Sequence, residues 1–337
     1  MTKLVSIGVP LYKRFEYLPH ILEIVAAQDY PSIELIVSDN GLNGPQLRDR
    51  IAALYPKPFR FRQNSATVDV AKHFNQIIQE ASGEYCIILA DDDEISDNYV
   101  SELVSQLERN PQASVAMARQ EMINAQGKVI RKAEENLPAM LSGPEFILAA
   151  WRSYAFKFEC FATFLARTRD LRENGGYQEF TRGNYSDNAL LIKLCLDKGV
   201  VFSRKCVFRW RVVESSQGWS VNVRDLAAAS CEFLRFLDRD PVLRQYAVAH
   251  PVQWRELKNC LVQMTWGTYL WRWRDIYRKR LTRWGWVRAA FALPFIPAYY
   301  REVRRTFKER LKAYAGGVVK QWSSVLGGGG RSPGGHS

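Results

Sequence analysis

Short runs of apolar, β-branched residues alternate with polar stretches through the first hundred positions of the chain. Residues 4–9 and 33–37 are two such runs, and their length and composition predict buried strands. The apolar positions between them recur at the spacing of one helix face, and they are Leu18, Ile21, Leu22 and Val25. Pro10 follows the first run and is expected to end that strand. The order strand, helix, strand predicts a parallel unit of an α/β fold.

A third apolar run, residues 85–89, leads into three consecutive carboxylates. Asp91, Asp92 and Asp93 follow it at the end of a predicted strand, where ligands of open α/β sheets bind. Packed like charges raise each other's pKa, so a bound cation is expected, and a divalent metal with oxygen ligands fits best. The alternative is an acidic turn that caps the next helix, with Ser96 or Asp97 as the N-cap.

The second predicted strand also ends on polar residues. Ser38, Asp39, Asn40 and Gly41 follow it, and a carboxylate at this position can accept hydrogen bonds from a base or a ribose. The chain has no Gly-x-Gly-x-x-Gly turn after its first strand and no Gly-x-x-x-x-Gly-Lys loop. These absences argue against a dinucleotide-binding fold of that type and against a P-loop.

Five segments, taken in order, resemble the family 2 glycosyltransferases. They are Val-Ser-Ile-Gly-Val-Pro-Leu-Tyr-Lys-Arg at 5–14, Ser-Asp-Asn-Gly at 38–41, Ala-Lys-His-Phe-Asn-Gln-Ile-Ile at 71–78, Ser-Gly-Glu-Tyr at 82–85 and Leu-Ala-Asp-Asp-Asp at 89–93. The resemblance covers about residues 3–225, and its specificity lies in the order and spacing of the segments. It implies the GT-A fold, a Rossmann-like mixed sheet flanked by helices, in an enzyme that takes a nucleotide-sugar donor.

The resemblance implies a donor site residue by residue. Its members would be Pro10, Tyr12 and Arg14 around the nucleotide base, Asp39 accepting a hydrogen bond from the base, Asn40 beside it, and Lys72 and Asn75 near the sugar and phosphates. Asp91 and Asp93 would be the ends of the Asp-x-Asp motif that holds Mg²⁺ or Mn²⁺ and the donor diphosphate. Asp92 belongs with them, because three consecutive aspartates leave the register open by one residue.

The resemblance also implies a catalytic base downstream of a Gly-Gly turn, at the start of a helix. Gly175 and Gly176 form such a turn, and Asp187 precedes the helical run 189–196 at the matching position. A general base that takes the proton of the acceptor hydroxyl contributes about 10²–10⁴-fold to the rate. The alternative is that Asp187 only caps the helix, since an acid at a helix N-terminus is stabilising in any case. Glu179 is the substitute base.

Residues 208–220 resemble the strand and loop that follow the base helix in this family. Arg209, Arg211 and Trp219 are candidate contacts to phosphate or acceptor, together with the Gly-Gly turn and Glu179, and an edge strand with a plain surface loop is equally compatible. The processive pattern Gln-x-x-Arg-Trp is absent, because the Arg-Trp pair at 209–210 lacks the upstream Gln. The resemblance therefore favours an enzyme that adds a single sugar.

The formal net charge of +12 lies at the C-terminal end of the chain. Residues 272–337 hold 15 of the 47 basic residues and only 3 of the 35 acidic ones, with several tryptophans among them. Basic helices with tryptophan on one face bind anionic membrane surfaces, while the apolar run 289–300 is shorter than the ~20 residues that span a bilayer. The predicted membrane contacts are Trp271, Trp273, Arg278, Lys279, Arg280, Trp284 and Trp286. The alternative is a helical extension with solvated arginines. No nucleic-acid-binding motif accompanies the charge.

Length and composition add a predicted organisation. The 337 residues, 47% hydrophobic, suffice for a large core. The six cysteines lie far apart in apolar stretches, which is typical of free thiols in a reducing compartment, and no signal peptide precedes the first strand. We expect a donor-binding half at 1–115, an acceptor-binding half with the base at 116–225, a helical membrane-associating region at 226–326 and a disordered tail at 327–337.

Together these features predict an α/β, GT-A enzyme with a basic, Trp-rich helical extension, peripheral on the cytoplasmic face of the plasma membrane. It would be an inverting, metal-dependent, non-processive hexosyl- or deoxyhexosyltransferase. Its partners would be a nucleotide-sugar, a lipid-linked saccharide acceptor of bacterial polysaccharide, O-antigen or capsule synthesis, and an anionic membrane, and not nucleic acid. The alternatives are a sugar nucleotidyltransferase and a catalytically inactive membrane adaptor of the same fold.

Overall fold

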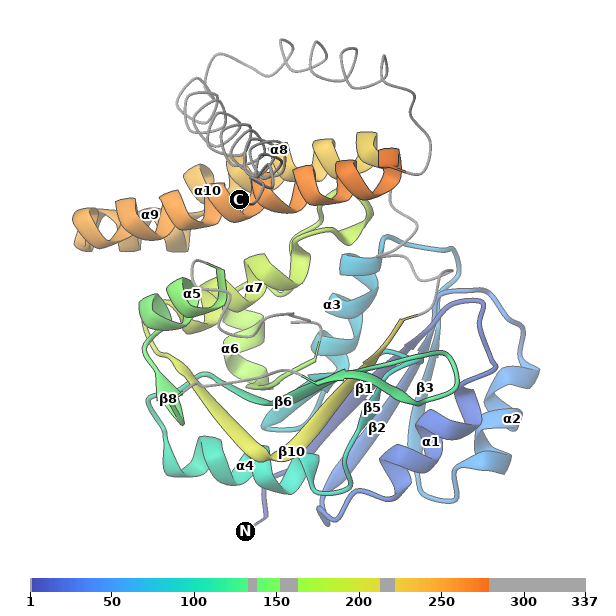
Figure 1. Cartoon of the computed structure of the whole chain (residues 1–337). Coiled ribbons are helices and arrows are strands. Elements are labelled where there is room, and N and C mark those ends of the chain that lie inside the picture. The colour runs from blue at the N-terminus through green and yellow to red at the C-terminus, as the bar shows by residue number, and fades with distance from the viewer. Residues whose placement is uncertain (1, 133–137, 152–162, 213–221, 279–337) are drawn as a thin grey trace, which may run out of the picture. The chain divides into compact units, whose positions relative to one another are not determined.

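The computed structural model describes residues 2–132, 138–151, 163–212 and 222–278 (Figure 1). Side chains at 223 and 270–278 are not described. The chain divides into two units, Met1–Trp273 and Arg274–Ser337. All the elements below, except the last residues of the final helix, lie in the first unit.

A mixed sheet forms the centre of the first unit. Within the described residues its order is β3-β2-β1-β4-β9-β6-β10-β5, with β7 beside β6 and β8 beside β10. The strands are β1 Val5–Leu11, β2 Ile33–Asp39, β3 Phe59–Gln63, β4 Tyr85–Ile88, β5 Glu94–Ile95, β6 Val115–Ile123, β7 Val129–Lys132, β8 Met140–Leu141, β9 Leu165–Arg167 and β10 Val200–Arg211. Strands β1 to β4 are parallel to one another, and β9 runs antiparallel between β4 and β6. The predicted mixed α/β sheet is confirmed.

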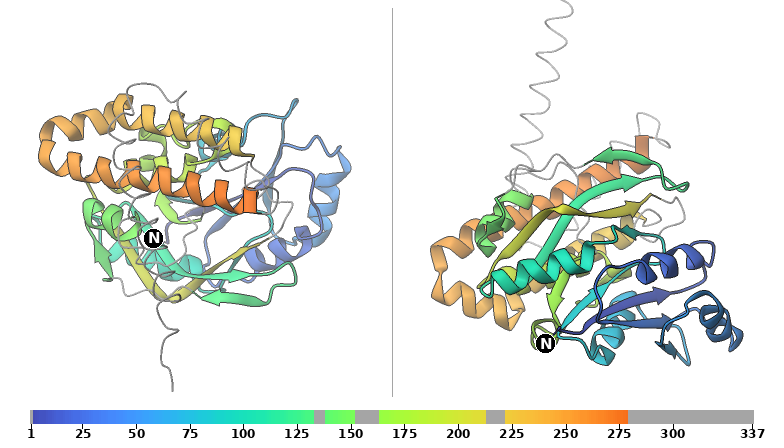
Figure 2. Two further views of the ribbon diagram at one scale, coloured as in Figure 1. Left: turned by 45° about the horizontal axis from the view of Figure 1, so that its top comes forward. Right: turned by 90° about the horizontal axis from the view of Figure 1, so that it is seen from below.

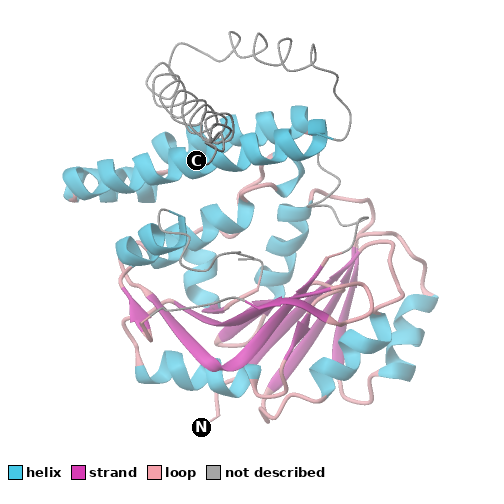
Figure 3. Ribbon diagram, viewed as in Figure 1, coloured by secondary structure: helices cyan, strands magenta, loops and turns pink. Residues whose placement is uncertain are grey.

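Helices cover both faces of this sheet (Figure 3). They are α1 Leu18–Ala26, α2 Gln46–Leu54, α3 Val70–Glu80, α4 Tyr99–Arg109, α5 Gly143–Trp151, α6 Thr168–Glu173, the 3₁₀ turn η1 Thr181–Gly183, α7 Ser186–Cys195, α8 Val223–Arg239, α9 Pro241–Ala249 and α10 Pro251–Arg278. Helices α1, α2 and α4 lie on one face, and α3, α6 and α7 lie on the other (Figure 1). Because both faces are covered, residues 5–9 are all buried, as expected of a central parallel strand.

The first strand is longer than expected, because it continues through Pro10 to Leu11. The ladder between β1 and β4 ends at Gly8, whereas that between β1 and β2 extends to Leu11. Pro10 therefore has a neighbouring strand on one side only, where a missing N–H can be tolerated. The prediction that proline ends this strand was wrong for that reason.

The three aspartates do not form a helix cap. Strand β5 follows them at once, and α4 begins at Tyr99 with Asn98 as its N-cap and no capping bond from a side chain. Ser96 donates instead to the Asn98 side chain. The capping alternative for this acidic stretch is therefore wrong.

Helices α8, α9 and the larger part of α10 belong to the same compact unit as the sheet. Helices α8 and α10 run alongside each other in Figure 1 and in the left view of Figure 2. The ring of Phe233 in α8 packs on Phe180 and stacks on Tyr185, just before α7. The expected boundary near residue 225 thus separates two segments that pack together. The predicted tail, 327–337, lies outside the described residues.

Candidate active site

The carboxyl ends of β1 and β4 meet at the centre of the sheet. The chain proceeds from β1 outward to β2 on one side, while β4 lies on the other side, so a topological switch point lies between them. Ligands of open α/β sheets bind at such points. Here the loop after β1 carries Arg14, and the loop after β4 carries Asp91 and Asp92. The fold therefore brings a cation and two carboxylates to the position where a ligand is expected.

Arg14 forms a two-pronged ion pair with the aspartates. Its Nη2 donates to Asp91 over 2.7 Å and its Nη1 donates to Asp92 over 2.8 Å. The two carboxylates are 9% exposed, and burial raises the pKa of Asp91 to about 6, although Arg14 opposes the shift. The sequence predicted Arg14 at the nucleotide base, and its guanidinium lies on the Asp triplet. The two ends of this pair are 77 residues apart, so no local pattern indicates it.

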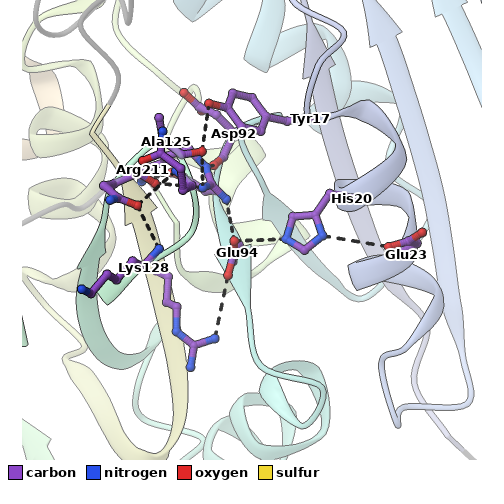
Figure 4. Close-up of polar contacts among 12 residues, drawn as sticks. Tyr17, His20, Glu23, Asp92, Glu94, Ala125, Lys128 and Arg211 are labelled. Atoms are coloured by element: carbon purple, nitrogen blue, oxygen red, sulfur yellow. Dashed lines mark hydrogen bonds and ion pairs between the residues drawn. The ribbon is translucent and has the colours of Figure 1, made fainter. Parts of the chain in front are cut away.

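Arg211, at the end of β10, contacts the Asp triplet through both its backbone N–H and its guanidinium. The Arg211 N–H donates to Asp93 over 2.9 Å, and its Nε donates to the carbonyl of Asp92 over 2.7 Å. The same guanidinium reaches the carbonyl of Ala125 and the carboxylate of Glu94 (Figure 4). Burial raises the pKa of Asp93 well above its usual value, and the charge of Asp92 adds to this. Since Arg211 is buried among protein acceptors, its contacts favour a positioning role over the predicted phosphate contact.

Glu94 connects this network to α1 and to the sheet. Its carboxylate lies 3.1 Å from Nε2 of His20 and 4.0 Å from Nη1 of Arg209. Figure 4 shows Glu94 between Arg211 and His20. Arg209 also donates through Nε to the buried Glu121 over 2.9 Å. The contacts of Arg209 are thus those of a strand residue paired with acids, which is the alternative considered for this segment.

Asp39, at the end of β2, is fully engaged by its own loop. Its Oδ1 accepts from the Gly41 N–H and from Asn43 Nδ2, at 2.8 and 2.6 Å. Its Oδ2 accepts from the Asn43 N–H and from Gln63 Nε2, at 2.9 and 2.8 Å. A carboxylate offers about four acceptor positions, so these bonds fill them. Asn43 and Gln63 were not predicted from the sequence, and a base that bonds to Asp39 would have to displace one of its protein donors.

Asn40 forms hydrogen bonds to the loop between β3 and α3, at residues 64 and 68. Its Nδ2 donates to the Val68 carbonyl, and its Oδ1 accepts from the Val68 N–H and from Asn64 Nδ2, all at 2.9 Å. On the same edge, Pro10 lies opposite Ser38 in the ladder between β1 and β2. The hydrogen bonds of Asn40 hold the loops after β2 and β3 together, next to the switch point.

Two of the predicted donor residues are exposed. The Tyr12 side chain is 49% exposed at the end of β1, while its backbone carbonyl accepts a hydrogen bond from Asn43. Lys72 is exposed in the first turn of α3. Both side chains are accessible to a ligand, and their predicted contacts with donor remain predictions.

Asn75 lies one turn further along α3, and its partner is the predicted Gly-Gly turn. Its Nδ2 donates to the Tyr177 carbonyl over 2.8 Å, and its Oδ1 accepts from the Tyr177 N–H over 2.7 Å. Gly175 and Gly176 both have positive φ, +73° and +64°, which only glycine adopts readily. The structure therefore joins two predicted site segments that are 102 residues apart.

Asp187 lies in the first turn of α7, half-buried. Burial raises the pKa of its carboxyl group, opposed by a 2.9 Å hydrogen bond that Oδ1 accepts from the Asn188 N–H. The preceding backbone is strained, because Arg182 and Tyr185 adopt φ of +58° and +66° without being glycine. Glu179, the substitute base, is exposed.

The described residues fit a divalent cation at the Asp triplet only in part. Asp91 and Asp92 already converge on one cationic group, whereas Asp93 accepts the Arg211 N–H. Within the described ranges, no group of three or more histidine, cysteine or acidic side chains comes together as a complete metal site. Mg²⁺ is commonly held by one or two carboxylates together with substrate phosphates and water. Asp91 and Asp92 provide the two carboxylates of such a site, and the remaining ligands would come from substrate and water.

Several predicted residues lie where the structure gives no side-chain description. Trp271, Trp273 and Arg278 are in the last turns of α10, where only the backbone is described. Trp219, Lys279, Arg280, Trp284 and Trp286 lie outside the described residues. In the part of the chain that the structure describes, no helix combines the length and apolar character needed to cross a membrane. The described cysteines are free.

Curated relatives match about a third of this chain. Glycosyltransferase GlyG of Streptococcus pneumoniae is 29% identical over 110 residues, which is 32% of this chain and 36% of GlyG. Abequosyltransferase RfbV of Salmonella typhimurium is 28% identical over 109 residues, which is 31% of this chain and 33% of RfbV. The chain thus spans about a third of the length of these relatives.

Solved structures share the fold at low sequence identity. S. aureus TarS 1–349 in complex with UDP-GlcNAc aligns over 82% of this chain and 74% of that one, with a TM-score of 0.58 and 15% identity. The mannosyltransferase PcManGT from Pyrobaculum calidifontis, in complex with GDP-Man and Mn²⁺, aligns over 96% of this chain and 88% of that one, with a TM-score of 0.50 and 15% identity. The predicted GT-A fold is confirmed.

The family profile described as glycosyl transferase family 2 matches residues 6–175. This range contains the loops after β1, β2 and β4, and it ends at the Gly-Gly turn that Asn75 holds. It spans half of the chain, and the predicted resemblance rests on the same segments. The chain belongs to glycosyl transferase family 2.

Proposed function

We propose that this chain is an inverting, metal-dependent glycosyltransferase that moves one sugar at a time from a nucleotide-sugar to a saccharide acceptor. The observation that carries the proposal is the convergence of Asp91 and Asp92 on one cationic group at the switch point of the sheet. A donor diphosphate bound there needs a cation between itself and these carboxylates. The Mn²⁺ and GDP-Man named with the structural neighbour PcManGT support the same chemistry.

In this proposal, the Asp triplet binds the metal and the donor diphosphate, and a separate carboxylate acts on the acceptor. The predicted metal ligands are Asp91 and Asp93, with Asp92 kept because the register was open by one residue. The contacts favour Asp91 and Asp92 as the residues that would hold the divalent ion, since both face the Arg14 cation while Asp93 accepts the Arg211 N–H. When bound, such an ion offsets the negative charge that grows on the leaving diphosphate. Arg14 would exchange its two carboxylate partners for phosphate oxygens as donor and metal enter.

Asp187 would act as general base toward the acceptor hydroxyl. Its half-buried carboxylate has a raised pKa, which makes it a stronger base than an exposed aspartate. One base and one bound donor allow a single displacement, which inverts the configuration at the sugar carbon. Glu179 remains the substitute.

The acceptor is proposed to be lipid-linked. The basic, Trp-rich residues 272–337 would hold the enzyme at the cytoplasmic face of an anionic membrane, where such an acceptor is presented. The abequosyltransferase name of RfbV supports deoxyhexose among the candidate sugars and bacterial polysaccharide as the product class. Full-length protein should sediment with phosphatidylglycerol vesicles at low salt and not with phosphatidylcholine vesicles. Equal binding to both would overturn the electrostatic part of this proposal.

Calorimetry tests the donor site. UDP, GDP, CDP and dTDP are titrated into wild type and the Asp91→Asn, Asp92→Asn and Asp93→Asn variants, with and without Mn²⁺. We expect wild type to bind one nucleotide in a metal-dependent way, and the variants of the true metal ligands to lose that dependence. Asp97→Asn is the matched control, because Asp97 is an exposed acid just beyond β5, a few residues from the triplet. Failure of wild type to bind any of the four nucleotides would overturn the proposed function.

A further inference from the structure

Helix α3 borders both parts of the candidate active site. It packs against β1, β2 and β4 on one side and against α6 and η1 on another. Figure 1 shows it between the sheet and the segment that leads to α7. His73 of α3 lies 2.8 Å from Ser38 Oγ, directly before Asp39. One helix therefore contacts both the end of β2 next to Asp39 and the segment that leads to Asp187.

The contact of α3 with the Gly-Gly turn runs through Asn75. Its amide makes two hydrogen bonds, of 2.8 and 2.7 Å, to the carbonyl and N–H of one residue, Tyr177. A β-carbon at Gly176 would lie 2.2 Å from Asn75 Oδ1, so the turn and the amide fit each other closely. With both Oδ1 and Nδ2 bonded to protein backbone, Asn75 is poorly placed to serve as a donor ligand.

A second contact holds the other end of the same segment. Gly183, with φ of +68°, lies so close to α3 that a β-carbon there would come within 2.3 Å of Val70 Cγ1. Val70 and Asn75 thus hold residues 176–183 at two points along one helix. The segment between the two glycines is fixed relative to the helix.

The fixed segment leads directly to Asp187. Ser186 Oγ donates to the Gln178 carbonyl over 2.6 Å, which ties the first turn of α7 to the residue after Tyr177. The Tyr177 ring packs edge-on against Phe74 of α3, with ring centroids 5.2 Å apart. The charge of Asp187 acts on Tyr177, adding to burial in raising the pKa of the phenol. The position of the Asp187 carboxylate therefore depends on where Tyr177 and Gln178 lie.

We propose that Asn75 is a positioning residue for the base: its paired hydrogen bonds to Tyr177 fix the turn that presents Asp187, and it does not contact the donor. The inference rests on the proposed function, in which Asp187 takes the acceptor proton. Displacement of a reacting group by about 1 Å can cost about 10²-fold in rate, so a turn held by two hydrogen bonds has a measurable effect. A donor contact would instead affect nucleotide affinity.

The first experiment separates these two roles. Asn75→Ala and Asn75→Asp are compared with wild type and with Gln79→Ala, an exposed position on the same helix. Hydrogen exchange of residues 174–187, the Kd for UDP and GDP with Mn²⁺, and the release of nucleotide from UDP-GlcNAc and GDP-mannose are measured. We expect Asn75→Ala to accelerate exchange in this segment and lower kcat at least tenfold, with the nucleotide Kd changed less than twofold.

Asn75→Asp should also lower kcat, because its carboxylate can still accept from the Tyr177 N–H but places its second oxygen against the Tyr177 carbonyl, where the amide had donated. A raised nucleotide Kd with unchanged kcat would overturn the proposal, and so would unchanged exchange in residues 174–187. The proposed function fails separately, if wild type neither binds a nucleotide nor differs from Asp187→Asn in turnover.

A double-mutant cycle keeps the proposal testable if single variants lose activity for trivial reasons. Gly176→Ala places a methyl group against Asn75 Oδ1, and Asn75→Ala removes that obstacle. We therefore expect the double variant to be no slower than Gly176→Ala alone, a clear departure from additivity. Losses of kcat that multiply would mean that the two residues act independently, and would overturn the proposal.

Discussion

Asp39 and Asp187 each lie at one end of a secondary-structure element, but their carboxylates differ in burial and in the hydrogen bonds that they accept. Asp39 is completely buried at the end of β2, and its two oxygens accept four hydrogen bonds from Gly41, Asn43 and Gln63. Asp187 is half-buried in the first turn of α7, and in the described contacts its carboxylate accepts from backbone N–H groups only, chiefly that of Asn188. The first carboxylate has no acceptor position left, while the second has several.

The backbone next to Asp39 and the backbone next to Asp187 are also held by different contacts. The loop after Asp39 is closed by the hydrogen bonds of the aspartate itself. In the turn before Asp187, Arg182 and Tyr185 adopt left-handed backbone conformations that residues other than glycine disfavour. The packing of α3 and α8 against this turn maintains them. The carboxylate of Asp39 organises its own loop, whereas that of Asp187 is presented by a strained turn that other elements hold, which leaves acceptor positions for a substrate.

The largest expected effect is that of Asp187→Asn. Loss of a general base should lower kcat by about 10²–10⁴-fold, with nucleotide affinity unchanged. Stability should equal or exceed that of wild type, because partial burial disfavours the charged carboxylate. The check is nucleotide release from the bound sugar donor, alongside chemical denaturation. Glu179→Gln is the control, and a loss in that variant with none in Asp187→Asn would exchange the two roles.

Asp39→Ala should have the opposite signature. It leaves the Gly41 and Asn43 amides without their acceptor, which should lower the free energy of unfolding by about 2–4 kcal/mol. Urea denaturation measures this effect, with Asp49→Ala, at an exposed acid of α2, as control. A fully stable Asp39→Ala that fails to bind nucleotide would show that Asp39 is a ligand group and not a loop organiser.

The buried imidazole of His73 should make the stability of the protein depend on pH. Burial lowers the pKa of His73 to about 4 from an ordinary 6.5, so between these values the unfolded chain binds a proton that the folded chain does not. Stability should therefore rise from pH 4 to pH 6.5, by up to about 3 kcal/mol from this residue, and be lost as the pH falls through that window. His73→Gln should flatten this part of the stability profile, because it removes the buried group whose pKa is lowered. Equal slopes in wild type and His73→Gln would contradict the assignment.

The smallest expected effect is at Tyr185. Tyr185→Phe keeps the stacked contact with Phe233, whose ring centroid is 5.1 Å away, and removes the 3.1 Å hydrogen bond to Ser230 Oγ. The free energy of unfolding should fall by about 0.5–1.5 kcal/mol, as measured by urea denaturation, with little change in turnover. A loss of turnover comparable to that in Asp187→Asn would mean that the hydroxyl, and not the packed ring, holds the turn.

Much of the fold could be predicted from local pattern. The apolar runs at 4–9, 33–37 and 85–89 correspond to β1, β2 and β4, and the periodic residues from Leu18 to Val25 fall within α1. The order of motifs along the chain was enough to predict the family, which the profile match confirms. Pro10 was misjudged, because its tolerance depends on which neighbour strand extends past it.

The sequence by itself determined which residues are candidates for the chemistry, namely the Asp triplet, the Gly-Gly turn and Asp187, because residue type and spacing limit what those segments can do. Only the tertiary structure decided how they are used. Arg14 meets Asp91 across 77 residues, and Asn75 meets Tyr177 across 102. Such pairs form because parallel strands bring distant loops to one edge of the sheet and because α3 packs against both halves of the site. Neither proximity leaves a signal in the local sequence.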